Sequence, residues 1–339
     1  MLLFALGSAL AQEAPPIVNG QDDNGSFKAV GALVSVKGNY GGSFCSGTLV
    51  HRKYVITAAH CIYPAWDYQD DGYTIYWVSS DDIYNGWDKY AEAYQMWAHP
   101  GYNDNSNNIS DDIGIIELKT AVTSWPTQDV NANYPTNAWS NKNVTYVGFG
   151  ITRENYNDGG VRRYVNVPFA GIDSDFAYTY YGGSGQVKNI CSGDSGGAAL
   201  MKFGSDYVLI GANSFTYNSQ GGSPNCDAAG AAGASTRTDA YWDWLTQYIP
   251  ENELNQGNTG GGDADTDADS DSDTDADSDS DSDADTDIGG TGFIDTGAPR
   301  RPPANTPPPD TGLMPGCATG APFGGLALAF VALIGARRR

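Results

Sequence analysis

One stretch of this chain limits where a folded core can form. Asp occupies every odd position from 263 to 287 and alternates with Ser, Thr or Ala, and the proline-rich run RPPANTPPPD follows at 301–310. A segment with few large apolar side chains and so much like charge cannot bury enough surface to offset the entropy of ordering it. We therefore expect residues 251–316 to be a disordered, self-repelling linker, and we place the folded domain within residues 17–250.

The charge balance excludes one class of partner. The 339 residues include 41 acidic and 18 basic side chains, a net charge of -23, and residues 1–250 alone hold 24 acidic and 13 basic side chains, a net of -11. A surface of that sign repels phosphate backbones, so we expect no nucleic-acid binding driven by charge. The 43 Gly and the many aromatic residues (21 Tyr, 8 Trp and 11 Phe) favour a β-rich domain of short strands and tight turns.

The beginning of the chain predicts export. Residues 2–10 are apolar and lead into small residues at the spacing that signal peptidase prefers. We therefore expect residues 1–11 to be a signal peptide and residues 12–16 a short propeptide. Four of the five Cys lie in the folded domain, where an oxidising compartment would allow them to pair.

The end of the chain carries a second targeting feature. Cys317 is followed by an apolar stretch, 321–336, and by three Arg at 337–339. This order resembles the myxobacterial-type (MYXO-CTERM) C-terminal sorting signal, which implies processing near Cys317 by a sorting machinery and display on a Gram-negative bacterium. A plain membrane anchor and a sortase-like motif at 308–312, which lacks the leading Leu, are the alternatives. We expect membrane contact through residues 317–339 only, and a location at the cell surface (outer membrane) or outside the cell.

Three short motifs in the folded domain carry the residue types of acyl transfer. GDSGG at 193–197 puts Ser195 on a glycine-rich turn, where exposed backbone N–H groups can hold an oxyanion. His60, within TAAHC, follows an apolar run and is one of three His in the chain. Asp112 opens the apolar run DIGIIEL, where a buried carboxylate can orient an imidazole. Taken singly, each motif also fits an ordinary turn, a structural His or a strand end.

In the order His60, Asp112 and Ser195, the three motifs resemble the trypsin/chymotrypsin-like serine proteases. IVNG at 17–20 is similar to the mature N-terminus of that family, and DAYWDWLTQYI at 239–249 is similar to its terminal helix. The resemblance implies an all-β fold of two packed six-stranded antiparallel β-barrels with a C-terminal helix and the site between the barrels. The disulfides that it implies are Cys45–Cys61 and Cys191–Cys226.

The resemblance also implies a role for each residue of the site. Ser195 would attack the scissile carbonyl, and His60 would take its proton and return it to the leaving amine. Asp112, rather than Asp111, would fix the imidazole tautomer. The N–H groups of Gly193 and Ser195 would hold the oxyanion. The implied function is a secreted or surface-anchored serine endopeptidase that acts on proteins or peptides and needs no cofactor or metal.

Activation is expected to require a cut before Ile17. By resemblance, the new ammonium group of Ile17 would pair with the carboxylate of Asp194 and shape the oxyanion hole, so the uncut chain would be a zymogen. Pro16 stands where many relatives carry Lys or Arg. A trypsin-like enzyme would therefore not make the cut, and we expect a different activating protease or stepwise trimming.

The substrate pocket is implied by the same resemblance. Its residues would be Asn189 at the floor and Ser214, Thr216 and Gly233 in the walls. Because Asn189 is uncharged and Thr216 narrows the pocket, we expect a preference for small or medium neutral side chains. Asp227 could restore a preference for basic side chains, and the net charge of -11 favours cationic substrates through long-range steering.

Three alternatives stay open at the level of sequence. The chain could be a structural surface protein whose active part is the linker, which would make the folded domain incidental. A protease-like fold could serve only in adhesion, with a triad that is never activated, and Pro16 is the feature that favours this hypothesis. Residues 67–82, rich in Asp and aromatic side chains, fit a solvated hairpin. A surface calcium loop is the alternative there, although the spacing of the acids matches no defined motif.

Overall fold

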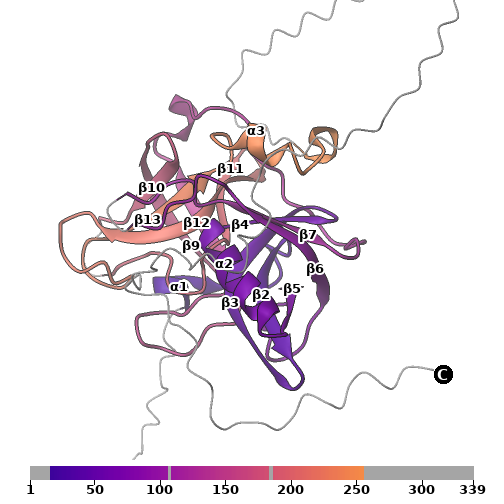
Figure 1. Cartoon of the computed structure of the whole chain (residues 1–339). Coiled ribbons are helices and arrows are strands. Elements are labelled where there is room, and N and C mark those ends of the chain that lie inside the picture. Colours follow the sequence, from indigo (N-terminus) through magenta and orange to yellow (C-terminus); the bar gives the residue numbers. More distant parts are fainter. Residues whose placement is uncertain (1–15, 106–107, 183–185, 256–339) are drawn as a thin grey trace, which may run out of the picture.

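The computed structural model describes residues 16–105, 108–182 and 186–255 (Figure 1). The expected signal peptide, the linker beyond residue 255 and the tail with Cys317 lie outside these residues. None of the helices in the described ranges is long and apolar enough to cross a membrane.

The first half of the folded domain is a closed antiparallel barrel. Its strands are β2 (Val30–Lys37), β3 (Tyr40–His51), β4 (Tyr54–Thr57), β5 (Thr74–Ser79), β6 (Lys89–Ala98) and β7 (Gly114–Leu118). They pair in the order β2-β3-β4-β7-β6-β5, and β5 closes the barrel on β2.

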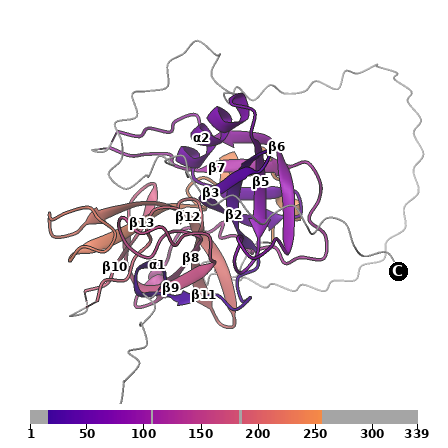
Figure 2. The same ribbon diagram turned by 90° about the horizontal axis from the view of Figure 1, so that it is seen from below.

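The second half forms a barrel of the same kind. Its strands are β8 (Asn143–Gly148), β9 (Arg163–Ile172), β10 (Phe176–Tyr180), β11 (Ala198–Phe203), β12 (Asp206–Asn218) and β13 (Ala231–Arg237). They pair in the order β9-β10-β13-β12-β11-β8, β8 closes the ring on β9, and the short β1 (Gln21–Asp22) adds to β9. Figure 2 shows the two barrels side by side, the first in purple and the second in pink and orange. The predicted pair of six-stranded barrels is confirmed.

Two strands of the first barrel, β4 and β7, are buried on both faces, which explains their uninterrupted apolar sequences. In β4, Val55 faces the core of the first barrel, whereas Ile56 faces a second core that contains residues of both barrels. Ile116 and Ile115 of β7 divide in the same way. A strand with both faces covered shows no polar alternation. The shared core, which includes Val147, joins the two barrels along the seam where the candidate site lies.

The helical segments are short. They are α2 (Ala59–Asp70), η1 (Asn137–Trp139), α3 (Trp242–Leu245) and η2 (Glu251–Glu253). The segment labelled α1 (Pro16–Asn19) is not a regular helix, because Ile17 and Val18 have non-helical backbone angles. The predicted C-terminal helix is present, but regular helix covers only α3. Turns continue to Ile249, whose N–H donates to the carbonyl of Leu245 at 3.0 Å.

The hairpin expected over residues 67–82 is wrong. Residues 67–70 form the last turn of α2, and residues 74–79 are β5, a strand of the barrel that pairs with both β2 and β6. Ile75 and Trp77 are fully buried in the barrel core, and Tyr68 and Tyr76 are half-buried against the cores, so this stretch is not a solvated surface.

The folded domain extends past the boundary at residue 250 that the composition suggested. Leu254 is buried in the shared core. The N–H of Val130 donates to the carbonyl of Asn255 at 2.9 Å. Five residues assigned to the linker therefore pack on the domain.

Candidate active site

Strand pairing brings the predicted His and Asp together. His60 is the second residue of α2 and follows β4 closely, and Asp112 lies two residues before β7. β4 and β7 are antiparallel neighbours, with Thr57 opposite Gly114. The end of β4 and the start of β7 therefore lie at the same edge of the barrel, and the side chains next to them meet there.

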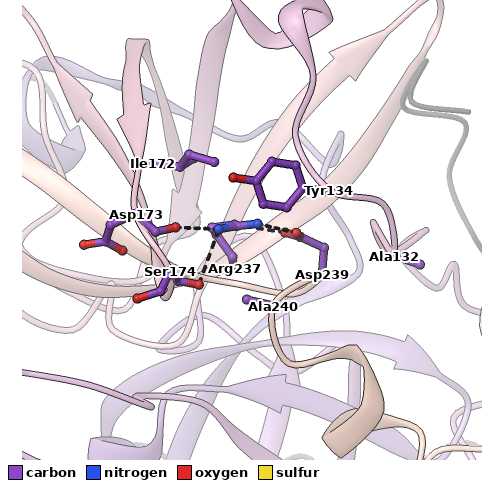
Figure 3. A pocket seen from close by; sticks show the side chains of 8 residues that line it. All are labelled: Ala132, Tyr134, Ile172, Asp173, Ser174, Arg237, Asp239 and Ala240. Atoms are coloured by element: carbon purple, nitrogen blue, oxygen red, sulfur yellow. Dashed lines mark hydrogen bonds and ion pairs between the residues drawn. The ribbon is translucent and has the colours of Figure 1, made fainter.

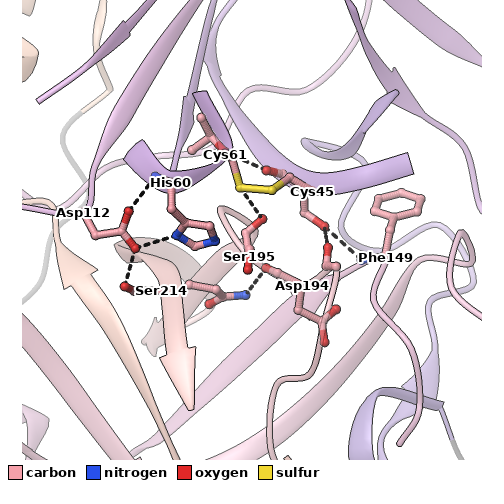
Figure 4. The surroundings of a disulfide bond; sticks show 12 residues. Cys45, His60, Cys61, Asp112, Phe149, Asp194, Ser195 and Ser214 are labelled. Atoms are coloured by element: carbon pink, nitrogen blue, oxygen red, sulfur yellow. Dashed lines mark hydrogen bonds and ion pairs between the residues drawn. A yellow bond between two sulfur atoms is a disulfide. The ribbon is translucent and has the colours of Figure 1, made fainter. Parts of the chain in front are cut away.

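The carboxylate of Asp112 accepts hydrogen bonds at both oxygens. Oδ1 accepts from the backbone N–H of His60 at 2.9 Å, Oδ2 contacts Nδ1 of His60 at 2.8 Å, and the hydroxyl of Ser214 also donates to Oδ2 (Figure 4). Asp112 is 1% exposed, and burial acts to raise its pKa. The charge of His60 and the hydrogen bonds from His60 and Ser214 outweigh burial, so the pKa lies below its usual value and the carboxylate stays ionised.

The imidazole of His60 is held on one side and free on the other. Burial of the ring acts to lower its pKa, but attraction to Asp112 and the shared hydrogen bond raise the pKa above its usual value. Nδ1 faces Asp112, and Nε2 has no hydrogen-bond partner among the described residues. Figure 4 shows Ser195 beside the ring. The arrangement leaves Nε2 ready to accept a proton, and such contacts tighten when substrate is bound.

The segment that carries Ser195 is held by both barrels. The carbonyl of Ser195 accepts from the N–H of Ser46 in β3 at 2.8 Å, and the N–H of Gly196 donates to the carbonyl of Asn213 in β12 at 2.7 Å. Gly196 has a φ of 73°, and a Cβ there would lie 2.0 Å from Oγ1 of Thr57. Only glycine fits at this position, because the backbone crosses the seam in direct contact with β4.

Two backbone N–H groups beside the Ser195 hydroxyl are free. Within the described residues, the N–H groups of Gly193 and Ser195 donate no hydrogen bond, whereas the N–H of Asp194 between them donates to the carbonyl of Cys191 at 3.0 Å. Gly193 has a φ of 94°, a conformation that favours glycine. Paired free donors next to a nucleophile can bind the oxygen of a tetrahedral intermediate.

Both predicted disulfides are present. Cys45–Cys61 joins β3 to the first turn of α2, with the Cα atoms 6.1 Å apart, and therefore lies next to His60. Cys191–Cys226 joins the segment before Ser195 to the loop between β12 and β13, with the Cα atoms 5.2 Å apart. Each bond fixes a chain segment that carries a site residue.

Asp194 and Ile17 are both buried in the uncut chain. The carboxylate of Asp194 accepts from the N–H groups of Gly150 and Cys191, each at 2.8 Å. Burial outweighs these bonds and the nearby charge of Arg163, and it raises the pKa of Asp194 to about 7. Ile17 is 0% exposed and has a φ of 38°, which is strained for a β-branched residue.

Three of the predicted pocket residues are neighbours: Thr216 lies opposite Gly233 in the β12–β13 pair, and Gly233 contacts Asn189. Asn189 is fully buried; its Nδ2 donates to the carbonyl of Ala232 at 3.2 Å, and its Oδ1 has no partner among the described residues. A Cβ at Gly233 would lie 2.8 Å from that oxygen, so the two residues are in contact. The hydroxyl of Thr216 donates to the carbonyl of Pro224 at 3.0 Å. The resemblance implies a place for Ser214 only in the pocket wall, and nothing in its spacing indicates its hydrogen bond to Asp112.

Asp227 lies in a separate surface cleft of about 680 Å³. The cleft is also lined by Asn19, Arg153 and Tyr180, and its described lining contains neither Asn189 nor Gly233. Asp227 and the predicted pocket floor therefore do not line the same cleft.

The other two His have partners outside the candidate site. His51 pairs with Glu253. His99 lies 3.2 Å from Asp111 and packs against Tyr241 and Trp244. Burial lowers the pKa of His99 despite the nearby carboxylates of Asp111 and Asp175. The structure thus places Asp112, and not Asp111, against His60.

A cleft of about 440 Å³ surrounds Arg237, whose guanidinium binds groups of the protein itself (Figure 3). The guanidinium donates to both carboxylate oxygens of Asp239 and to the carbonyls of Asp173 and Ser174. These contacts satisfy the charge of the guanidinium within the protein.

Possible metal ligands in the described residues occur as two clusters of three. Each cluster is a disulfide pair joined by one further side chain, His60 in one and Glu154 in the other. Oxidised sulfurs are not thiolate ligands, so neither cluster fits a metal ion.

Comparison with known proteins agrees with this geometry. The model of the trypsin family matches residues 17–245. Bovine (Bos taurus) chymotrypsin-like elastase family member 1 is 26% identical over 61% of this chain and 79% of its own length. Trypsin-1 of Salmo salar is 28% identical over 73% of this chain and 96% of its own length. Phenoloxidase-activating enzyme 1 of Spodoptera litura is 28% identical over 62% and 60% of the two chains.

Proposed function

Because this chain belongs to the trypsin family and is a serine endopeptidase, we propose that His60, Asp112 and Ser195 form its catalytic triad. The observation that carries the proposal is the two-point contact of the Asp112 carboxylate with the backbone N–H and Nδ1 of His60. This contact fixes the tautomer that presents an unprotonated Nε2 toward Ser195.

The proposed reaction moves one proton through His60. Oγ of Ser195 attacks the scissile carbonyl while Nε2 takes the hydroxyl proton, and the N–H groups of Gly193 and Ser195 bind the oxyanion. Collapse of the tetrahedral intermediate breaks the C–N bond, and Nε2 returns the proton to the leaving amine. Water then attacks the acyl-enzyme by the same route and releases the acid product.

We propose that the uncut chain is a zymogen. Ile17 is already buried, and Asp194 is a buried carboxylate that lacks a side-chain counter-ion in direct contact among the described residues. Cleavage between Pro16 and Ile17 would give an ammonium group that can pair with it. An activating protease that accepts Pro before the scissile bond is therefore the expected partner.

The substrate preference follows from the pocket. Asn189, Ser214, Thr216 and Gly233 offer no charge, which supports cleavage after small or medium neutral residues. Export to the cell surface or the medium is supported by the two disulfides, which persist in oxidising compartments. Display through processing of the tail near Cys317 rests on the sequence alone.

Reaction with a fluorophosphonate probe tests the proposal. Two exported forms would be compared, one beginning at Ile17 and one at Gln12, with Ser195→Ala as the control. We expect labelling of the Ile17 form that disappears in the variant, and a silent Gln12 form. A folded Ile17 form that stays unlabelled would show that the triad is not assembled, and the domain would then be a protease-like binding protein.

A further inference from the structure

The two carbonyl groups on either side of Asp194 are held by one residue, Ser46. Its backbone N–H donates to the carbonyl of Ser195 at 2.8 Å, and its hydroxyl donates to the carbonyl of Gly193 at 2.8 Å. Ser46 lies in β3 of the first barrel and is fully buried. The carbonyls of Gly193 and Ser195 are therefore held by hydrogen bonds from the first barrel. The N–H groups of the same two residues donate no hydrogen bond within the described chain.

The hydroxyl of Ser46 makes a second contact. It accepts from the N–H of Phe149 at 3.0 Å, and the N–H of the next residue, Gly150, donates to Oδ1 of Asp194 at 2.8 Å. The Ser46 hydroxyl thus connects β3 with two loops of the second barrel. One is the loop that carries Gly193, and the other contains Phe149 and Gly150, whose N–H donates to Asp194. Removal of this hydroxyl would leave the carbonyl of half-buried Gly193 and the N–H of buried Phe149 without this partner, and an unpaired buried N–H is costly.

We propose that the Ser46 hydroxyl positions the oxyanion hole. Gly193 has no side chain to restrict rotation about its backbone bonds, so contacts on the peptide that follows it must set its orientation. The N–H of that peptide, from Asp194, donates to the carbonyl of Cys191, and its carbonyl, from Gly193, accepts from the hydroxyl of Ser46. The bond from Ser46 provides one of these contacts and fixes the turn that carries the Gly193 N–H. Ser46 touches no substrate atom, so it is a positioning residue. The inference rests on the proposed triad mechanism.

Two probes separate positioning of the oxyanion hole from general stability. A peptide aldehyde forms an adduct with Ser195 whose oxygen occupies the oxyanion hole, and the matching peptide alcohol forms none. Both would carry the sequence that the wild-type enzyme cleaves best in a peptide library. For Ser46→Ala we expect kcat and aldehyde affinity to fall about tenfold, with KM and alcohol affinity within about twofold. Ser46→Gly should change them in the same direction.

Thr238→Val is the matched control. Thr238 is also fully buried, and its hydroxyl bonds the carbonyls of Asn131 and Leu209 at 2.8 and 3.2 Å, away from the Ser195 loop. We expect this variant to lower the melting temperature by a comparable amount and to leave aldehyde affinity within about twofold.

Each outcome decides the inference. Unchanged aldehyde affinity in folded Ser46→Ala and Ser46→Gly would overturn it, and so would an equal loss of aldehyde and alcohol affinity. A wild-type enzyme that does not react with the fluorophosphonate would overturn the proposed function as well. A selective loss of aldehyde affinity in the Ser46 variants supports the inference.

Discussion

The charge of Asp112 decides the state of His60 at the scale of single residues. Burial would lower the pKa of the imidazole, and the adjacent carboxylate reverses that effect. The same carboxylate binds the backbone N–H of His60, so it orients the ring and its helix together. The charge of Asp112 makes Nε2 a stronger base, and its contact with Nδ1 determines where Nε2 points.

Asp112→Asn should lower kcat by about 10⁴, because the amide favours the wrong imidazole tautomer. It also removes the charge that raises the pKa of His60, while burial remains. Activity is lost in acid when His60 is protonated, so the acid limb of kcat/KM should move to lower pH than in the wild-type enzyme. A profile from pH 5 to 9 measures both effects. Asp111→Asn is the control and should leave the limb in place, since Asp111 contacts His99 instead.

Gly196 and Gly204 share a positive φ and differ in their surroundings. A Cβ at Gly196 would lie 2.0 Å from Oγ1 of Thr57, whereas a Cβ at Gly204 would meet nothing within 4 Å. Gly204→Ala should cost about 1 kcal/mol of unfolding free energy from backbone strain alone. Gly196→Ala should cost more and abolish fluorophosphonate labelling, because the Ser195 segment must move. Urea denaturation and labelling would show this, and equal costs would contradict it.

At the scale of elements, the sequence indicated the site residues that lie directly beside a strand, His60 after β4 and Asp112 before β7. The apolar runs beside His60 and Asp112 became β4 and β7, and their pairing explains why residues 52 positions apart meet. The sequence did not reveal Ser46 as a partner of the site, nor the bond from Ser214 to Asp112, because each of these contacts joins a strand of one barrel to a loop of the other. It misassigned residues 67–82, since aromatic side chains mark either a surface or a core until the pairing of β5 is known.

Arg162 connects elements of both barrels. It lies just before β9, and its guanidinium bonds Asp23, the carbonyl of Val30 in β2 and the hydroxyl of Ser79 in β5. The side chains of Arg162 and Asp23 are 1% and 0% exposed. Arg162→Met should lower the unfolding free energy by roughly 3–5 kcal/mol, because the Asp23 carboxylate is left buried without its partner.

Lys119→Met provides the comparison for Arg162. Lys119 pairs with Glu92 at 3.1 Å, and both side chains are more than one-third exposed. Its loss should cost less than about 1 kcal/mol. Urea denaturation of the two variants measures the difference, and similar costs would show that Arg162 does not hold the barrels together.

For the whole molecule, the cut before Ile17 should change how stability depends on pH. In the uncut chain the pKa of Asp194 is about 7, above the value of about 4 in an unfolded chain. Between these values the folded state binds a proton that the unfolded state does not. The stability of the uncut chain therefore falls as pH rises, by up to roughly 1.4 kcal/mol per pH unit.

An ammonium group on Ile17 would remove this loss, because it favours the ionised carboxylate and lowers the pKa of Asp194. The Ile17 form should thus exceed the Gln12 form in melting temperature by a gap that widens from pH 4.5 to pH 7.5. Above about pH 8 the amine of the unfolded chain is no longer protonated, so keeping the proton on the paired amine becomes less favourable and the gap should narrow again. Asp194→Asn in both forms should make the gap independent of pH. A constant gap in the unsubstituted pair would mean that the new amine does not pair with Asp194.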